Sequence, residues 1–99
     1  MKIPKSFQLF GNTIKVEIDA DKMDEAGAYG ETRYRTDTIT LSNKAHGKAI
    51  CKTEIETALF HEIFHTVLKR TSHHELCSDE KIVDLIARGL HQVMTTMKY

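Results

Sequence analysis

Apolar residues spaced four positions apart constrain the second half of this chain more than any other feature of its sequence. The first such series predicts an amphipathic helix over residues 54–70, because residues at this spacing share one helical face. It consists of Ile55, Leu59, Ile63 and Val67. A second series predicts another helix from Asp79 onward. It consists of Ile82, Val83, Leu85, Ile86, Leu90, Val93, Met94 and Met97. Each helix must bury its apolar face against another element.

The first half of the chain alternates between apolar and polar residues, which is typical of half-buried strands. We expect a hairpin over residues 7–19 with its turn at Gly11-Asn12, and two further strands over 28–34 and 38–42, joined by a turn at 35–37. Strands followed by helices predict an α+β fold. In this fold, a small sheet of antiparallel type packs on the two helices.

Polar segments separate the expected elements. Residues 19–27 are compatible with either a helical turn or a loop, and residues 43–52 are expected to form a connecting loop. Thr53-x-x-Glu56 resembles a capping box that would open the first helix, and Ser78 is a candidate N-cap of the second. Residues 71–78 would connect the two helices.

Charge and cysteine content restrict the classes of function. Fourteen basic residues balance fourteen acidic ones, so the chain lacks the basic surplus that a nucleic-acid or anionic membrane partner requires. No segment approaches the length of a membrane span, and Cys51 and Cys77 form no C-x-x-C pair. We therefore expect one cytoplasmic domain over 1–99, with no nucleic-acid or membrane partner and with two free thiols that ligate no metal.

The segment His61-Glu62-Ile63-Phe64-His65, inside the first expected helix, carries the clearest chemical pattern. Because residues four apart lie on one helical face, His61 and His65 can present two ring nitrogens to one zinc ion. Glu62 lies beside that face. Its carboxylate can accept a proton from a metal-bound water and return it to a leaving amine, as a general base does.

A catalytic zinc site usually has a third protein ligand, and several residues downstream can supply it. Glu80 and Asp84 are four apart in the first turns of the second expected helix, so Glu80 can ligate the metal while Asp84 accepts the free ring N–H of a ligand histidine. The alternatives lie in the connector, where they would have to fold back over the helix end. They are His73, His74 and Glu75.

His61-Glu62-Ile63-Phe64-His65 followed by Glu80-Lys81-Ile82-Val83-Asp84 resembles the H-E-x-x-H plus E-x-x-x-D pattern of the gluzincins, the thermolysin-like zinc peptidases. The resemblance to small single-domain members, the minigluzincins and small phage metallopeptidases, covers residues 38–99. It implies a minimal zincin fold, with Glu80 as third ligand and Asp84 orienting a ligand histidine. The gap between the two motifs is short, and the lower subdomain of the larger members is absent.

The resemblance also implies that the strand over 38–42 is an edge strand that pairs with extended substrate. Its alternation, with Ile39 and Leu41 facing the core and Thr38, Thr40 and Ser42 outward, is compatible with an edge strand and equally with any half-buried strand. His91 shares a helical face with Glu80 and Asp84, so it is a candidate for stabilising an oxyanion, or else a histidine at the edge of the helix packing.

These patterns predict a Zn²⁺-dependent hydrolase of peptide bonds that acts on a peptide or protein substrate. The alternative is a zinc-binding module with little or no catalysis that acts by protein interaction, for example a phage-encoded modulator of a host protein. A nucleic-acid-associated protein has only Lys69-Arg70 and the paired histidines in its favour. The sequence leaves the oligomeric state open.

Overall fold

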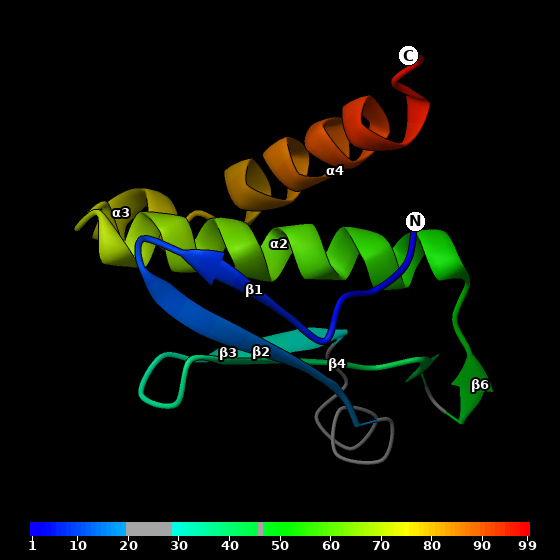
Figure 1. Ribbon diagram of the computed structural model, residues 1–99, viewed down its shortest axis with the longest axis horizontal. Coiled ribbons are helices and arrows are strands. Elements are labelled where there is room, and N and C mark those ends of the chain that lie inside the picture. Colours follow the sequence, from blue (N-terminus) through cyan, green and yellow to red (C-terminus); the bar gives the residue numbers. More distant parts are fainter. Residues whose placement is uncertain (20–28, 46) are drawn as a thin grey trace.

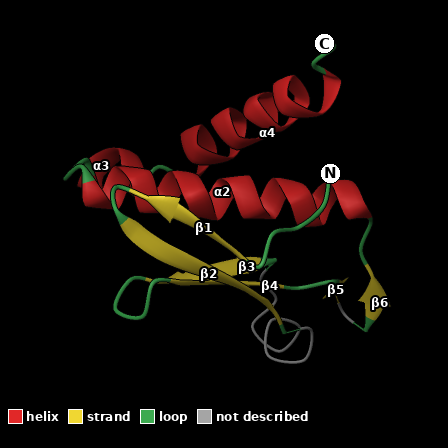
Figure 2. Ribbon diagram, viewed as in Figure 1, coloured by secondary structure: helices red, strands yellow, loops and turns green. Residues whose placement is uncertain are grey.

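A computed structural model describes residues 1–19, 29–45 and 47–99 of the chain, as a mixed four-stranded sheet with helices packed on it. The α+β prediction is therefore confirmed (Figures 1 and 2). Most of the polar segment 19–27 and the loop residue His46 lie outside the described residues, as does the first residue of the strand expected over 28–34. Among the described helices, none is long and apolar enough to cross a membrane.

The N-terminal hairpin consists of β1 (Ser6–Leu9) and β2 (Asn12–Ile18), which pair antiparallel. Its turn is formed by Phe10 and Gly11, one residue earlier than predicted. Both residues have positive φ angles, 50° and 83°, which matches the tight turn whose twist suits a two-residue hairpin. Ile14 and Val16 of β2 point into the core.

The rest of the sheet corrects two predictions. The strands β3 (Gly30–Arg33) and β4 (Thr38–Leu41) pair antiparallel, but β4 runs parallel to β2, so the sheet is mixed and not of antiparallel type. The strand order is β1-β2-β4-β3, which makes β4 an interior strand and β3 an edge strand. The edge predicted for residues 38–42 is therefore wrong. Thr38, Thr40 and Ser42, expected to face outward, are buried along with Ile39 and Leu41.

A small antiparallel ladder, β5 (Lys44–Ala45) with β6 (Lys48–Ala49), occupies part of the expected loop before the first helix. The helix α2 (Lys52–Arg70) then begins with Cys51 as its N-cap residue, without a capping hydrogen bond from a side chain. The predicted capping box is therefore wrong. Glu56 contacts groups elsewhere in the fold.

The connector contains one short helical turn, α3 (His74–Cys77), and leads into α4 (Glu80–Thr96). The N-cap of α4 is Asp79 and not Ser78, because the Asp79 side chain accepts a hydrogen bond from the backbone N–H of Ile82 at 3.1 Å. The Ser78 hydroxyl instead donates to the backbone carbonyl of His74 in the preceding turn.

The elements form three layers, with α2 between the sheet and α4 (Figure 1). The core lies between the sheet and α2, and it is apolar because alternate residues of β2 and β4 face the inner side of the helix. Its buried residues are Ile14, Val16, Ile39, Leu41, Ala58 and Leu59. On its other side, α2 meets the buried Val83 and Ala87 of α4.

One buried polar contact also joins α2 to α4. Glu56 accepts a hydrogen bond from His91 Nε2 at 2.7 Å, and the N-terminal ammonium of Met1 lies 3.5 Å from its other carboxylate oxygen. Burial opposes ionisation of Glu56, but the hydrogen bond from His91 and the ammonium charge together lower its pKa. The pair therefore attaches the middle of α4 to α2.

Candidate metal centre

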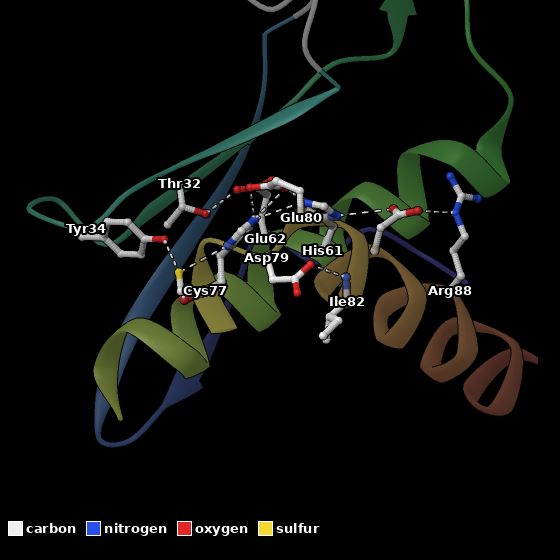
Figure 3. A network of polar contacts seen from close by, with 11 residues as sticks. Thr32, Tyr34, His61, Glu62, Cys77, Asp79, Glu80, Ile82 and Arg88 are labelled. Atoms are coloured by element: carbon white, nitrogen blue, oxygen red, sulfur yellow. Dashed lines mark hydrogen bonds and ion pairs between the residues drawn. The ribbon is translucent and has the colours of Figure 1, made fainter. Parts of the chain in front are cut away.

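Side chains from two helices converge at one point between α2 and α4 (Figure 3). His61 and His65 of α2 place their Nε2 atoms 3.1 Å apart. Glu80, the first residue of α4, has its Oε2 atom 2.8 Å from His61 Nε2 and 3.2 Å from His65 Nε2. One nitrogen or oxygen from each of the three side chains lies within 4.8 Å of the others. His61, His65 and Glu80, the residues predicted to ligate the metal, therefore lie side by side in the structure.

The spacing of these atoms fits a small tetrahedral cation. With ligand bonds of about 2.0–2.1 Å, neighbouring ligand atoms of such an ion lie about 3.3–3.4 Å apart. The separations of 3.1 Å between the histidine nitrogens and 3.2 Å between His65 and Glu80 are close to that value, whereas the 2.8 Å between His61 and Glu80 is shorter. Two imidazole nitrogens and one carboxylate oxygen also form a donor set that suits Zn²⁺. The chemistry of the group therefore fits zinc.

Glu62 lies behind the two histidines, with 8% of its surface exposed. Its Oε1 atom accepts a hydrogen bond of 2.8 Å from the Thr32 hydroxyl of β3. Burial raises the pKa of Glu62, and the Thr32 hydrogen bond and the neighbouring histidines oppose the rise only in part. Gly30 provides the space, since a Cβ atom there would lie 3.2 Å from Glu62 Cγ. The edge strand therefore fixes the position of the carboxylate.

Two hollows flank Glu62 and share Gly30, His61 and Glu62 in their walls. One, of about 820 Å³, opens past Thr32 and Tyr34 toward α3. The other, of about 510 Å³, extends along the N-terminal part of α2 toward α4. Residues of β3 line both hollows. A chain lying along β3 would therefore pass Glu62 and find a hollow on each side of it.

Asp84 lies one turn after Glu80, with its Oδ1 atom 3.4 Å from His61 Nδ1. This is the far ring nitrogen of His61, the one that an orienting carboxylate would contact. Arg88 donates to the other carboxylate oxygen of Asp84 at 2.9 Å and also lies 3.4 Å from Glu54 of α2. The hydrogen bond from Arg88 lowers the pKa of Asp84, so the carboxylate stays ionised well below neutral pH.

Cys77 of α3 lies on the opposite side of the pair, with its Sγ atom 3.4 Å from His65 Nδ1. The Tyr34 hydroxyl is 4.0 Å from the same sulfur, and burial raises the pKa of Tyr34. The far nitrogens of the two histidines therefore have different neighbours, a carboxylate for His61 and a thiol for His65. Of the two cysteines, Cys51 is exposed and lies away from the cluster, and both are free thiols.

The other candidate residues do not join this group. His91 bonds to Glu56 and stacks edge-on against Phe60, with ring centroids 5.9 Å apart. It lies eleven residues along α4 from Glu80, which corresponds to about 16 Å of helix. His73, His74 and Glu75 are exposed in the connector and line a separate hollow. Of these four residues, none lies in the cluster of ligand atoms.

No family model, no curated protein and no solved structure matches the chain. The resemblance to gluzincins thus rests on the residues of the two motifs.

Sequence reasoning missed four residues that shape this site. Arg88 was detectable, because it follows Asp84 by four positions on one helix, a spacing at which opposite charges pair. Thr32 and Gly30 act across the gap between β3 and α2. Cys77 reaches His65 only because α3 turns back beside the end of α2. Contacts between β3 and α2, or between α3 and the end of α2, leave no pattern in the local sequence.

Proposed function

We propose that the chain is a zinc-dependent hydrolase of peptide bonds. The observation that carries this proposal is the convergence of His61, His65 and Glu80 on one point, with the buried carboxylate of Glu62 beside it. Zinc bound by such a donor set would polarise a peptide carbonyl and lower the pKa of a coordinated water toward about 7. The protein's own contribution is to orient these groups and to move a proton.

Glu62 is suited to the role of general base. Burial raises the pKa of Glu62 toward neutral pH, which makes its carboxylate a better proton acceptor. The hydrogen bond from Thr32 occupies one of its oxygens and leaves the other available. In this role Glu62 removes a proton from the attacking water and delivers it to the leaving nitrogen.

Asp84 and Arg88 support the ligand histidines in the proposed site. An ionised Asp84 can accept the Nδ1 proton of His61, which leaves His61 Nε2 unprotonated and facing Glu80. Arg88 keeps Asp84 ionised and in place. These contacts raise the basicity of the ligand nitrogen, as carboxylates beside metal-binding histidines generally do.

The proposed substrate is an extended or unfolded peptide. The edge strand β3 lies against the site, and strand edges bind extended chains through backbone hydrogen bonds. The hollows on each side of Glu62 would take side chains on each side of the cleaved bond. We also propose a cytoplasmic setting, where the exposed thiol of Cys51 would stay reduced.

The test compares the zinc-loaded wild type with Glu62→Gln on a mixed pool of unstructured peptides. Glutamine keeps the size of the side chain and can still accept the Thr32 hydrogen bond, but it cannot take up a proton. We expect the variant to retain zinc and to lose peptide hydrolysis by about 10²–10⁴-fold, the usual contribution of a positioned general base. Glu75→Gln, at an exposed glutamate of α3, is the matched control and should cleave like the wild type.

Two results would contradict the proposal. If the chain takes up no zinc, both the hydrolase and the zinc-binding module fail. If the wild type binds zinc and cleaves nothing in the pool, the hydrolase fails, and a zinc-binding interaction module becomes the better description. Mass spectrometry of the peptide pool and metal analysis of the same sample separate these cases.

A further inference from the structure

The outer face of α4 is apolar and exposed. Six large apolar side chains of α4, and that of Met97 directly after its last residue, each leave more than a third of their surface in water. They are Ile82 (39%), Leu85 (72%), Ile86 (42%), Leu90 (36%), Val93 (50%), Met94 (52%) and Met97 (49%). Together these side chains expose on the order of 600 Å², about the largest apolar patch expected on a monomer.

The contacts of α4 with the rest of the chain do not explain why this face is apolar. On α4 only Val83 and Ala87 are fully buried. An amphipathic helix that needed only this attachment would carry polar residues over the rest of its circumference. Here the apolar arc continues well past the part that is buried, and it contains no charged residue. The charged residues of α4 lie on the remaining part of its surface, and they are Glu80, Lys81, Asp84 and Arg88.

Two pairs of apolar residues are placed symmetrically on this face. Counted outward from the midpoint between Gly89 and Leu90, Ile86 corresponds to Val93 and Ile82 corresponds to Met97. Leu85 and Met94 lie on opposite flanks of the face, because nine residues span two and a half helical turns. An interface between identical chains related by a two-fold axis requires a self-complementary surface. Two copies of α4 packed antiparallel would bring Ile86 opposite Val93 and Ile82 opposite Met97.

Gly89 lies at the centre of this arrangement. Glycine weakens the middle of a helix, and a Cβ atom at position 89 would meet nothing within 4 Å in the single chain. The interior of the chain therefore does not require a glycine there. Between two helices that cross at this point, the missing side chain allows the backbones to approach closely.

We propose that a second copy of this chain covers the face, with the two α4 helices antiparallel and the two-fold axis passing beside Gly89 and Leu90. The exposed apolar area approaches the roughly 800 Å² per partner of a standard protein interface, so we expect a dimer with a dissociation constant in the micromolar range. Glu80 and Asp84 lie away from this face, so the candidate metal centre stays open in the dimer. The dimer does not depend on the proposed hydrolase function.

Sedimentation velocity of the full chain, at about 1 to 100 µM and with and without zinc, tests the dimer. The wild type should approach twice the 11.3 kDa chain mass as concentration rises. Ile86→Glu and Val93→Lys, each at a partly exposed position, should both weaken association by at least about 100-fold while circular dichroism stays unchanged. Thr95→Glu, at an exposed position on the opposite side of α4, is the control and should leave the dimer intact.

The double variant Ile86→Glu/Val93→Lys tests the orientation. In the antiparallel arrangement each glutamate lies opposite a lysine of the other copy, so the dimer should return. In a parallel arrangement like charges would meet, and the double variant would stay monomeric. A monomeric wild type at about 100 µM overturns the proposal and leaves the face to a different partner. Loss of the dimer in Thr95→Glu, or an intact dimer in both single variants, also overturns it.

Discussion

At the scale of single residues, the fold keeps the Glu62 carboxyl in a place where its ionised form is unfavourable. The side chain is buried against β3, and this burial raises its pKa above the ordinary value of 4.5. A carboxyl that is hard to ionise lowers the stability of the folded chain at neutral pH, even when it is useful as a proton acceptor. Burial of Glu62 therefore lowers the free energy of unfolding at neutral pH.

This cost predicts how stability depends on pH in the metal-free protein. Above pH 4.5 the unfolded chain has released the Glu62 proton while the folded chain retains it, so folding becomes less favourable as pH rises through the raised pKa. Glu62→Gln has no such proton. We expect urea unfolding to give the variant an advantage in stability that is absent near pH 4 and grows toward neutral pH. An advantage that is the same at every pH would contradict this explanation.

The two acids at the start of α4 should contribute unequally to zinc affinity. Glu80→Ala removes a ligand, whereas Asp84→Ala removes only the partner of His61 Nδ1 and should weaken zinc binding by roughly 10–100-fold. Isothermal titration with zinc would measure both variants, with Glu75→Ala as a control. If Asp84→Ala were the more damaging change, Asp84 would be the ligand and the two roles would be exchanged.

The proximity of the candidate ligand residues could be predicted from the sequence because their positions follow from helix periodicity. His61 and His65 are four apart on one helix, and Glu80 and Asp84 are four apart on the next, so each pair shares a face. Thr32 and Gly30 had no such signal. Their role depends on how β3 is placed against α2, which no periodicity within either element determines.

At the scale of elements, the start of α4 is important because it carries Glu80. Asp79 caps this helix, so Asp79→Ala should lower the free energy of unfolding by about 1 kcal/mol, the typical cost of losing an N-cap side chain. Ser78→Ala is the matched control. The Ser78 hydroxyl bonds to the preceding turn, so its loss should cost less in the same denaturant titration. Equal losses would restore Ser78 as a capping residue.

The pairing of β2 with β4 shows where element-level prediction fails. Alternation of apolar and polar residues identified both strands, but alternation is the same whether a strand pairs parallel or antiparallel. The burial of Thr38 and Thr40 was missed for a related reason. Threonine is compatible with either face of a strand, so the alternation of Thr38 and Thr40 with Ile39 and Leu41 does not tell whether the threonine face is covered.

At the scale of the whole molecule, bound zinc should hold two layers of the fold together. Its proposed ligands come from α2 and α4, so the ion would stabilise the packing of these helices on each other. A ligand that binds only the folded state at 1,000 times its dissociation constant adds about 4 kcal/mol of stability. We therefore expect thermal unfolding to move to lower temperature when a chelator is added. His61→Ala should unfold at the same temperature with and without chelator, and a shift in this variant would indicate zinc bound elsewhere.

The division of the site between helices and sheet has a consequence for how sequence change can alter the protein. All three proposed ligand residues lie in the continuous segment 61–80, whereas the groups that position Glu62 lie in β3. Under the proposed function, metal binding and turnover can therefore change independently. A related chain in which only Gly30 or Thr32 differed would be expected to keep the metal and lose turnover, and the H-E-x-x-H signature in its sequence would give no sign of the loss.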